Sequence, residues 1–248
     1  MVKDINQLDS FGKNALHYSV IGASLAMTEE LLTHPTIDPD AKAQGGLTPL
    51  AYAAQDGHFD IMKTLLERHA SADPKDDAGK SPLEHAVLNR HADCVAELIN
   101  AGACLRFGDG GGDDDEKSEP RSTVLHAAIM GGETNARTSF VGALMERADE
   151  LPQLKDPAVL DQTTRDGWTP LQQAVLFGDH VAVRELLLHG ANPGPALGTA
   201  RTVRRVMEAH GALDQQVWLR DGGVPAIQHF RYSLDAIFEN LERFRRTV

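Results

Sequence analysis

The sequence has few aromatic residues, few cysteines and no long hydrophobic run. Phe, Trp and Tyr make up 5% of its 248 residues, which favours helices that pack through small side chains. Cys94 and Cys104 form no CxxC pair, and no His/Cys cluster has zinc-ligand spacing. No run of about eighteen apolar residues predicts a transmembrane helix, and the N-terminal stretch MVKDINQLDS lacks the apolar core of a signal peptide. We therefore expect an intracellular protein, cytoplasmic or nuclear, without a bound metal.

Recognisable catalytic motifs are also absent. The sequence contains no GxSxG, HExxH, P-loop or GxGxxG pattern, so no cofactor is predicted. The net charge of −12 repels phosphate backbones and anionic lipid head groups. These features argue against nucleic acid and membranes as partners and favour another protein.

An internal repeat of about 33 residues dominates the chain. The stretch GLTPLAYAAQDGH (46–58) recurs as GKSPLEHAV (79–87), GWTPLQQAV (167–175), GKNALHYSV (12–20) and STVLHAA (122–128). The position of the TPL threonine is held by Asn14, Thr48, Ser81, Thr123 and Thr169, at spacings of 34, 33, 42 and 46. A second segment, DIMKTLLERHA (60–70), recurs as DCVAELINAGA (93–103) and HVAVRELLLHGA (180–191). Such self-similarity is typical of stacked structural repeats.

Each repeat is predicted to form two short helices. Thr48 can cap the first helix with its hydroxyl, and Pro49 fits the first helical position, where no amide hydrogen is needed. Gly57 is expected to end that helix. After the second helix, Gly102 supplies a left-handed residue, whereas His69 holds the equivalent position with mild backbone strain.

These motifs resemble the ankyrin repeat family over about residues 9–192. The resemblance rests on the G-x-TPLH-x-AA-x-x-GH pattern followed by LL-x-x-GA. It implies an all-α ankyrin-repeat solenoid in which two antiparallel helices and a hairpin form each repeat. It also implies that His17 and His126, which hold the His position of TPLH, hydrogen-bond to backbone between repeats.

The predicted organisation is an ankyrin repeat array over 1–212 and an extended C-terminal helical cap or partner-binding helix over 213–248. Within the array we place the repeat starts near residues 9, 43, 76, 118 and 164, an acidic Gly-rich insertion at 106–121, a second insertion at 146–162 and a half repeat at 199–212. The second insertion is expected to lengthen a helix and add a structured loop, since Leu151, Leu154, Val159 and Leu160 give it apolar groups to bury.

The C-terminal segment 224–248 carries one apolar stripe at helical spacing. Its members are Ile227, Phe230, Leu234, Ile237, Leu241 and Phe244, and the pattern predicts an amphipathic helix. One interpretation is that this helix folds back onto the last repeat, since a lone helix is marginal in water. The other is a dimerisation or partner helix, because the spacing also suits a short coiled-coil seam.

At the other end, only eight residues precede Asp9. A further interpretation is therefore that the chain is a fragment or a regulatory subunit whose first repeat is covered by another segment.

By analogy with the ankyrin family, hairpin tips and first helices line a concave face. The outward positions would be Phe11, Lys13, Ile21, Leu47, Gln55, Asp56, Lys80, Leu88, Asn89, Met130, Arg165, Asp166, Trp168, Leu176 and Phe177. Five of them, Ile21, Leu88, Met130, Leu176 and Phe177, fall at equivalent places in four repeats and could form a continuous apolar stripe. Such a stripe usually marks a binding surface, unless the insertions or the C-terminal helix cover it.

The first functional hypothesis is a non-enzymatic protein–protein interaction module that binds a partner peptide or domain on this face. Its candidate binding residues are Ile21, Leu88, Met130, Trp168, Leu176 and Phe177 as apolar anchors, with Asp56, Lys80 and Arg165 setting orientation at the rim.

The alternative is a small-molecule enzyme of isomerase or cyclase type, with an apolar groove closed by the insertions or the C-terminal helix. Acid–base groups near the expected face are Tyr18, Tyr52, Asp56, His58, His85 and His180. Asp56 and His58 could act as a proton-transferring pair. A buried, unpaired His or Asp in a closed cavity would favour this alternative.

Overall fold

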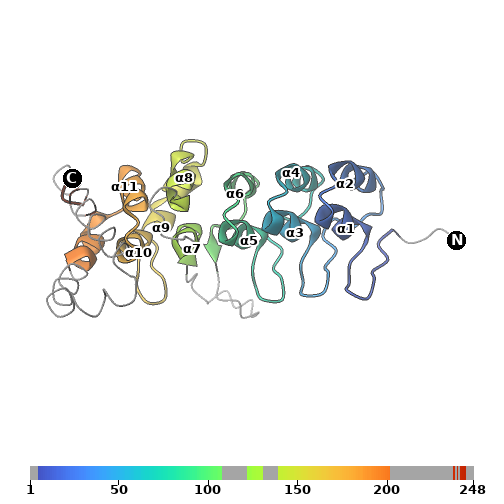
Figure 1. Ribbon diagram of the computed structural model, residues 1–248, viewed down its shortest axis with the longest axis horizontal. Helices are drawn as coiled ribbons and strands as arrows, with labels where there is room; N and C mark the ends of the chain where they lie inside the picture. Colours follow the sequence, from blue (N-terminus) through green and yellow to red (C-terminus); the bar gives the residue numbers. More distant parts are fainter. Residues whose placement is uncertain are drawn as a thin grey trace, which may run out of the picture. The chain divides into compact units, whose positions relative to one another are not determined.

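The computed structural model describes residues 5–107, 122–130, 139–201, 237, 239 and 241–243. The chain divides into two compact units, Met1–Ala127 and Ala128–Val248, and each is considered by itself. Helices dominate both units, which confirms the all-α class (Figure 1). In chain order the elements are α1 (Ala15–Ile21), α2 (Leu25–Leu32), α3 (Pro49–Asp56), α4 (Phe59–Glu67), α5 (Pro82–Leu88), α6 (Ala92–Asn100), β1 (Arg106–Phe107), β2 (Ser122–Thr123), α7 (Val124–Met130), α8 (Phe140–Glu146), η1 (Pro152–Lys155), α9 (Pro157–Leu160), α10 (Pro170–Phe177) and α11 (His180–Leu188).

The first helix of each regular repeat starts as its sequence predicts. The Thr48 and Ser81 hydroxyls accept hydrogen bonds from the backbone N–H groups of Ala51 and Glu84, and a proline opens α3, α5 and α10. The side chain of Asn14 does the same for α1 by accepting from the His17 N–H at 3.1 Å. Each cap satisfies one of the four amide groups that a helix start leaves without an intrahelical acceptor.

In the first unit, the three helix pairs stack side by side. Figure 1 shows α1, α3 and α5 in one row and α2, α4 and α6 in a second row, with the hairpins extending from the first row. Leu16, Leu50 and Leu83, which stand two residues after the three caps, are fully buried. Burying one leucine side chain contributes about 1.5–3 kcal/mol. No isolated pair of such short helices is stable in water, so stacking is what stabilises each repeat.

The left-handed residues predicted after the second helices are confirmed, and Gly57, which ends its helix as expected, is left-handed as well. Gly57, Gly102 and Gly190 have φ angles of 74°, 85° and 99°, and His69 has φ 66°. A left-handed conformation costs a non-glycine residue roughly 1–2 kcal/mol. After its second helix the second repeat thus carries strain that the third and fifth avoid at the same position, although the third has another left-handed residue in Arg90, with φ 62°.

The acidic insertion is anchored by a short pair of strands. Arg106 lies opposite Thr123 and Phe107 opposite Ser122 in the antiparallel pair β1–β2. The first two residues of the predicted insertion therefore belong to a strand, and Phe107 is buried. The remainder of the insertion, 108–121, lies outside the described residues.

In the second unit, the prediction of a lengthened helix in the second insertion is wrong. Helix α8 ends at Glu146, and η1 and α9 follow it as separate short elements. Leu151, Leu154, Val159 and Leu160 are all buried. The apolar residues of the insertion therefore form short elements that bury their own side chains. Pro152 and Pro157 open η1 and α9, because proline fits the start of a helix and not its interior.

The C-terminal predictions fall largely outside the described residues. Residues 193–201 are helical, whereas 202–236 of the predicted half repeat and cap are not described. Within the predicted amphipathic helix, Ile237 and Leu241 are helical and fully buried. They are four residues apart on the predicted apolar stripe. The capping and dimerisation interpretations of 213–248 stay predictions.

Candidate functional site

In the first unit, the hairpins and first helices form a surface that we call the hairpin face. Backbone hydrogen bonds join successive hairpins: the N–H of Gln44 donates to the carbonyl of Phe11, and the N–H of Asp77 donates to that of Gly45, both at 2.9 Å. Gly46 packs so closely that a Cβ atom there would lie 2.7 Å from the Asp77 nitrogen. The hairpin face therefore has a fixed backbone.

A carboxylate at the base of two hairpins is bonded to a side chain of the first helix. Asp9 accepts from the backbone N–H groups of Phe11 and Lys13 and from the Tyr18 hydroxyl. The Tyr18 bond, followed by the Lys13 N–H, lowers the pKa of Asp9 below its usual value, and the same bond raises the pKa of Tyr18.

Asp76 is the equivalent of Asp9 in the third repeat. It accepts from the backbone N–H groups of Ala78 and Lys80, and its Oδ2 lies 2.8 Å from His85 Nε2. Burial alone would raise the pKa of Asp76, but the hydrogen bonds from Lys80 and His85 outweigh it and lower the pKa. Both carboxylates therefore remain charged and tie their hairpins to the helices.

Lys13 lies between two tyrosine rings. Its Nζ is 5.8 Å from the Tyr18 ring centroid and 5.3 Å from that of Tyr52, the geometry of a cation–π contact. The Tyr52 ring also meets His17 edge-on, at a centroid distance of 5.9 Å. Tyr18 is 50% exposed, whereas Lys13 and Tyr52 are half-buried, so a partner could reach this cluster from the Tyr18 side.

The predicted apolar anchors are exposed. Ile21 and Leu88 in the first unit, and Met130, Leu176 and Phe177 in the second, are 37–64% exposed. Of the ten large hydrophobic side chains exposed among the described residues, eight lie on hairpins or first helices, namely Leu8, Phe11, Tyr18, Ile21, Leu88, Met130, Leu176 and Phe177. The second helices carry only Met27 and Leu188 of this set. Exposed apolar surface is thus concentrated on the side predicted to bind.

The other predicted binding residues are also accessible. Asp56, Lys80 and Arg165 are exposed, whereas Trp168 is half-buried. The four residues Ile21, Asp56, Lys80 and Leu88 belong to the first unit, and Met130, Arg165, Trp168, Leu176 and Phe177 to the second.

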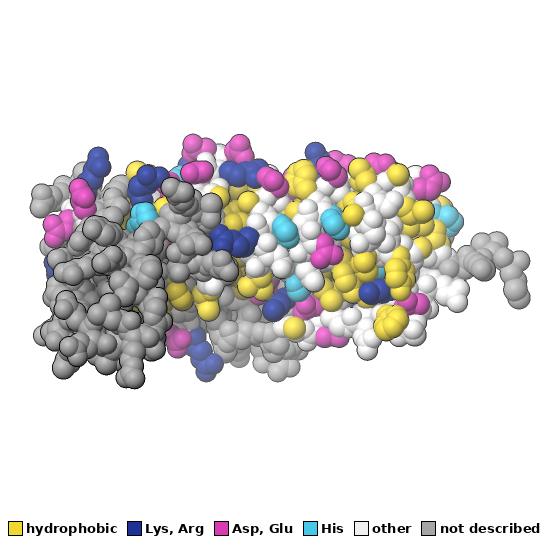
Figure 2. Space-filling view, viewed as in Figure 1, with side chains coloured by type: hydrophobic (Ala, Val, Ile, Leu, Met, Phe, Trp, Pro, Cys, Tyr) yellow, Lys and Arg dark blue, Asp and Glu magenta, His cyan; other side chains and the backbone are white. Residues whose placement is uncertain are grey.

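Charge is distributed unequally within the first unit. The hairpins and first helices (8–22, 41–57, 74–91) carry five Lys and Arg residues against five Asp and Glu residues. The second helices and the loops that follow them (23–40, 58–73, 92–107) carry three against nine. Figure 2 shows acidic side chains gathered along the second-helix side of this unit. The hairpin face is therefore the less acidic side of an acidic protein.

The groups considered for catalysis do not form an acid–base centre in the described part of the chain. Asp56 is exposed, and neither it nor His58 forms a hydrogen bond with the other's side chain. Tyr18 and His85 are bonded to hairpin carboxylates. The buried Nδ1 atom of His180 has no hydrogen-bond partner in the described residues, and it stands at the start of α11.

Both buried histidines of the TPLH positions hydrogen-bond to backbone, and for His17 one bond reaches the next repeat, as the family resemblance implies. His17 Nδ1 accepts from the Asn14 N–H, and its Nε2 lies 3.3 Å from the Leu47 carbonyl of the next repeat. Burial lowers the pKa of His17, opposed by hydrogen bonds to Leu47 and Ala41. His126 Nδ1 accepts from the Thr123 N–H at 3.1 Å. Among the residues that the structure describes, no cluster of three or more His, Cys, Asp or Glu could hold a metal ion.

The two thiols differ in environment. Burial raises the pKa of Cys94 to about 11, so this thiol stays protonated at neutral pH. Cys104 is exposed, and both cysteines are free.

One repeated set of contacts was missed at the sequence level. The Asp40, Asp73 and Asp161 carboxylates each accept from a backbone N–H 31 residues further along, and Asn6 Oδ1 accepts from the Asp38 N–H. Each of these side chains lies eight residues before a helix cap. Their spacing repeats that of the caps, which is the signal that could have predicted them.

None of the described helices is both long enough and apolar enough to cross a membrane.

The capped first helix, the antiparallel second helix and the bonded hairpins define a protein built of stacked helix-pair repeats. A family model described as "Ankyrin repeats (3 copies)" matches residues 1–76 and 30–109, and one described as "Ankyrin repeat" matches 166–196. The chain belongs to the ankyrin repeat family.

Individual relatives agree with this assignment. The chain is 26% identical to the ankyrin repeat protein nuc-2 of Neurospora crassa over 190 residues, which is 77% of this chain and 16% of that protein. It is 32% identical to the neurogenic locus notch homolog protein 1 of Mus musculus over 100 residues, which is 40% of this chain and 4% of that protein. The chain thus spans less than a fifth of either relative.

Among solved structures, an ankyrin repeat domain from Acinetobacter baumannii AYE has the same fold. Its TM-score is 0.61 at 24% sequence identity, and the match covers 77% of this chain and 89% of that one.

Proposed function

We propose that this protein is a non-enzymatic interaction module that binds a peptide or a domain of another protein through its hairpins and first helices. Ankyrin repeats are generally protein–protein interaction modules, and the chain belongs to that family. The observation that carries the proposal is the position of the exposed apolar side chains. Ile21, Leu88, Met130 and Leu176 each stand seven residues after a repeat marker and are exposed.

Such a regular arrangement of exposed apolar groups favours binding over bare surface. A scattered exposed leucine needs no explanation, but apolar side chains gathered at equivalent positions typically mark an interaction site. Within each unit, the anchors would fill apolar pockets of the partner, and rim charges such as Lys80 or Arg165 would set orientation. We place this protein inside the cell, which the free thiols Cys94 and Cys104 support.

The proposal is tested by removing the apolar anchors without disturbing the core. In the second unit, we expect the double variant Leu176→Asp/Phe177→Asp to lose partners that the wild type captures from a lysate of the source organism. Leu188→Asp is the matched control, because Leu188 is exposed and, like Phe177, is the last residue of its helix. An aspartate at either place meets the same unfavourable helix C-terminus.

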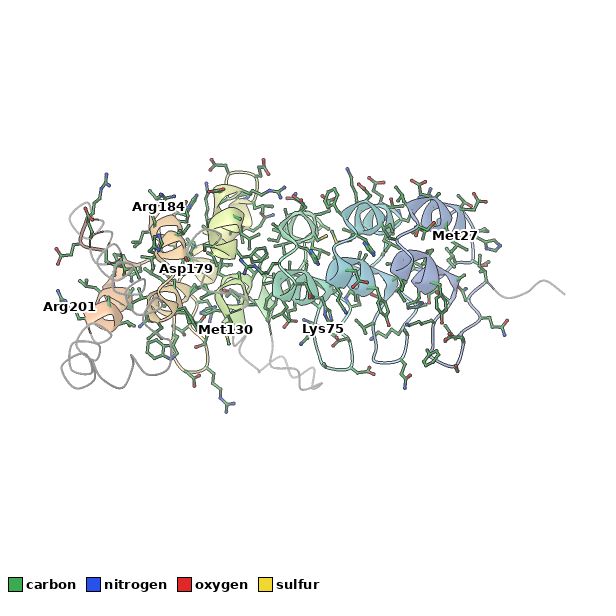
Figure 3. All side chains as sticks on the ribbon, viewed as in Figure 1. Met27, Lys75, Met130, Asp179, Arg184 and Arg201 are labelled. Carbon is green, nitrogen blue, oxygen red and sulfur yellow. The ribbon has the colours of Figure 1, made fainter. Side chains whose placement is uncertain are left out.

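The first unit is tested in the same way. Ile21→Asp/Leu88→Asp is compared with Met27→Asp, which changes an exposed side chain on α2 (Figure 3). Each variant should remain folded at the assay temperature, although an aspartate at the end of α1 or α5 is expected to lower the thermal midpoint slightly. If neither double variant reduces capture, or if the controls reduce it equally, the binding surface lies elsewhere and the proposal is wrong.

A further inference from the structure

One polar group on the hairpin face, the Tyr52 hydroxyl, lacks the acidic partner that its equivalents have. Tyr18, Tyr52 and His85 each stand four residues after a repeat marker. The Tyr18 hydroxyl donates to Asp9, and His85 is paired with Asp76. Asp9 and Asp76 each lie five residues before the marker, where the second repeat has Ala43. The Tyr52 hydroxyl accordingly makes no hydrogen bond to any residue that the structure describes.

The nearest cation is also without a direct anionic contact. The Lys13 ammonium lies 5.3 Å from the Tyr52 ring centroid, and among the described residues it forms neither a hydrogen bond nor an ion pair within 4 Å. The Lys13 charge lowers the pKa of Asp9, but the Asp9 carboxylate already accepts hydrogen bonds from the Tyr18 hydroxyl and two backbone N–H groups. One unpaired ammonium and one unpaired hydroxyl, both half-buried, are therefore adjacent on the hairpin face, beside the exposed side chains of Phe11 and Tyr18.

We propose that Lys13 and Tyr52 bind a carboxylate from an acidic segment of the partner protein. The inference rests on the proposed function and names the partner's chemistry. A glutamate or aspartate side chain would receive a charge-assisted hydrogen bond from Lys13 and a second from Tyr52. It would supply to the second repeat the acidic group that Asp9 and Asp76 supply within their own repeats.

The surroundings define the rest of the segment. Phe11 and Ile21 are 58% and 37% exposed, and they offer apolar contacts to residues beside the carboxylate. The second-helix side of the unit, with nine acidic side chains against three basic ones over 23–40, 58–73 and 92–107, would repel an acidic segment. The hairpin face has no net charge and carries Lys13 as a local cation, so it is the side of this unit that an acidic, apolar-containing peptide can approach.

The test begins with a random-sequence peptide library displayed on phage and selected on the full chain. We expect the enriched peptides to combine Asp or Glu with Leu, Ile, Phe or Trp. For the strongest fluorescein-labelled peptide, Lys13→Met should weaken binding about tenfold and Tyr52→Phe about threefold, since charge-assisted hydrogen bonds are the stronger ones. Lys13→Arg should retain most of the affinity, and Lys63→Met, an exposed change on α4, should leave it unchanged.

A double-mutant cycle separates direct contact from a general effect of charge. Replacing the acidic residue of the peptide by its amide should weaken binding to the wild type about tenfold but should have little further effect on Lys13→Met. Circular dichroism and thermal unfolding should show that all variants fold as the wild type does.

Two results would overturn the inference in distinguishable ways. Enriched peptides without acidic residues, or peptides that depend on Ile21 and Leu88 but not on Lys13 and Tyr52, would refute the carboxylate site and leave the proposed function intact. Failure to enrich any peptide that depends on the hairpin face would count against both. Binding of a single-stranded oligonucleotide that Lys13→Met abolishes would show that the site takes phosphates instead, which also refutes the inference.

Discussion

The first three repeats and the last two use the same helix caps and hairpin contacts, but the spacing of their markers differs. In the former, the markers Asn14, Thr48 and Ser81 are 34 and 33 residues apart, whereas Thr123 and Thr169 are separated by 46. Yet Thr169 caps α10 as Ser81 caps α5, each within a capping box. Asp161 likewise accepts from a backbone N–H 31 residues ahead, as Asp73 does.

The comparison shows that the helix caps and the aspartate contacts of a repeat are retained after an insertion whose residues bury their own apolar side chains. In the second unit, Leu151 and Leu154 are fully buried in and beside η1. Because the insertion lies between helix pairs and not inside one, the pairing of α10 with α11 is retained. A repeat array can therefore change its spacing without losing the caps that start each helix.

The largest expected effect comes from removing the equivalent core leucine in each unit. Leu83 and Leu171 are both fully buried, two residues after a cap. We expect Leu83→Ala and Leu171→Ala each to lower the free energy of unfolding by about 2–5 kcal/mol. Hydrogen exchange should show faster exchange around α3 and α5 for the first variant, and around α10 and α11 for the second. Equal acceleration throughout the chain in both variants would show that the two units unfold together.

A smaller effect is expected from a glycine packed between repeats. A Cβ atom at Gly57 would lie 2.6 Å from the His91 ring, whereas at Gly190 nothing lies within 4 Å. Both residues have positive φ. Gly190→Ala should therefore cost only the backbone strain of about 1 kcal/mol, and Gly57→Ala about 1–2 kcal/mol more because His91 must move. Urea unfolding of the two variants measures the difference. Equal losses in the free energy of unfolding would mean that the His91 ring moves away from the new Cβ atom without a measurable cost.

The repeated carboxylate contacts should contribute about equally in both units. Asp73→Ala and Asp161→Ala each remove the acceptor of a backbone N–H, and we expect each to destabilise by about 1 kcal/mol. Asp→Asn at the same positions keeps an acceptor and should cost less. Thermal unfolding of the four variants gives the comparison. If only the Asp73 variants or only the Asp161 variants lower the thermal midpoint, the contact stabilises only one of the two units.

Replacing the strained residue of the second repeat should stabilise the protein. His69 has φ 66° where Gly102 and Gly190 stand in other repeats. His69→Gly should raise the free energy of unfolding by about 0.5–1 kcal/mol, because relief of left-handed strain exceeds the entropic cost of glycine. A lower denaturation midpoint in this variant would mean that the His69 side chain makes a stabilising contact.

The smallest effect should appear as a pH dependence that differs between repeats. Burial lowers the pKa of His17 below its usual 6.5, whereas Gln172 holds the equivalent position in α10 and does not titrate. Since the unfolded chain binds a proton that folded His17 rejects, stability should fall as the pH drops from 7 through 6.5 toward the folded pKa. His17→Gln should make the slope of unfolding free energy against pH shallower. An unchanged slope would show that His17 does not contribute.

Much of the local structure could be predicted from the chain alone. A Thr-Pro pair such as Thr48 and Pro49 supplies a helix cap and a first helical residue, because both residues act on backbone groups within three positions. The exposed positions Ile21 and Leu88 followed from the repeat register. The shortness of α8 could not be predicted in this way, because the apolar residues of its insertion fit a longer helix as well as separate short ones.

The contacts on the hairpin face required the structure for a related reason. Asp9 and Tyr18, like Asp76 and His85, are nine residues apart, and no helical or strand period brings such a pair together. The position of Lys13 between Tyr18 and Tyr52 further depends on how two repeats stack. The candidate carboxylate site is therefore a property of packing, although each of its residues is visible in the sequence.

The sequence by itself determined the repeat and the starts and ends of its regular helices, because caps, prolines and left-handed glycines act within a few residues of the backbone. The outward-facing positions were implied by the resemblance to ankyrin repeats. Only the tertiary structure decided which hairpin carboxylates are engaged and which cation and hydroxyl remain available to a partner. The carboxylate pairs form where a hairpin folds back on its own first helix. The place of Lys13 beside Tyr52 depends on the distance between neighbouring repeats, and that distance is set by the packing of buried leucines such as Leu16 and Leu50.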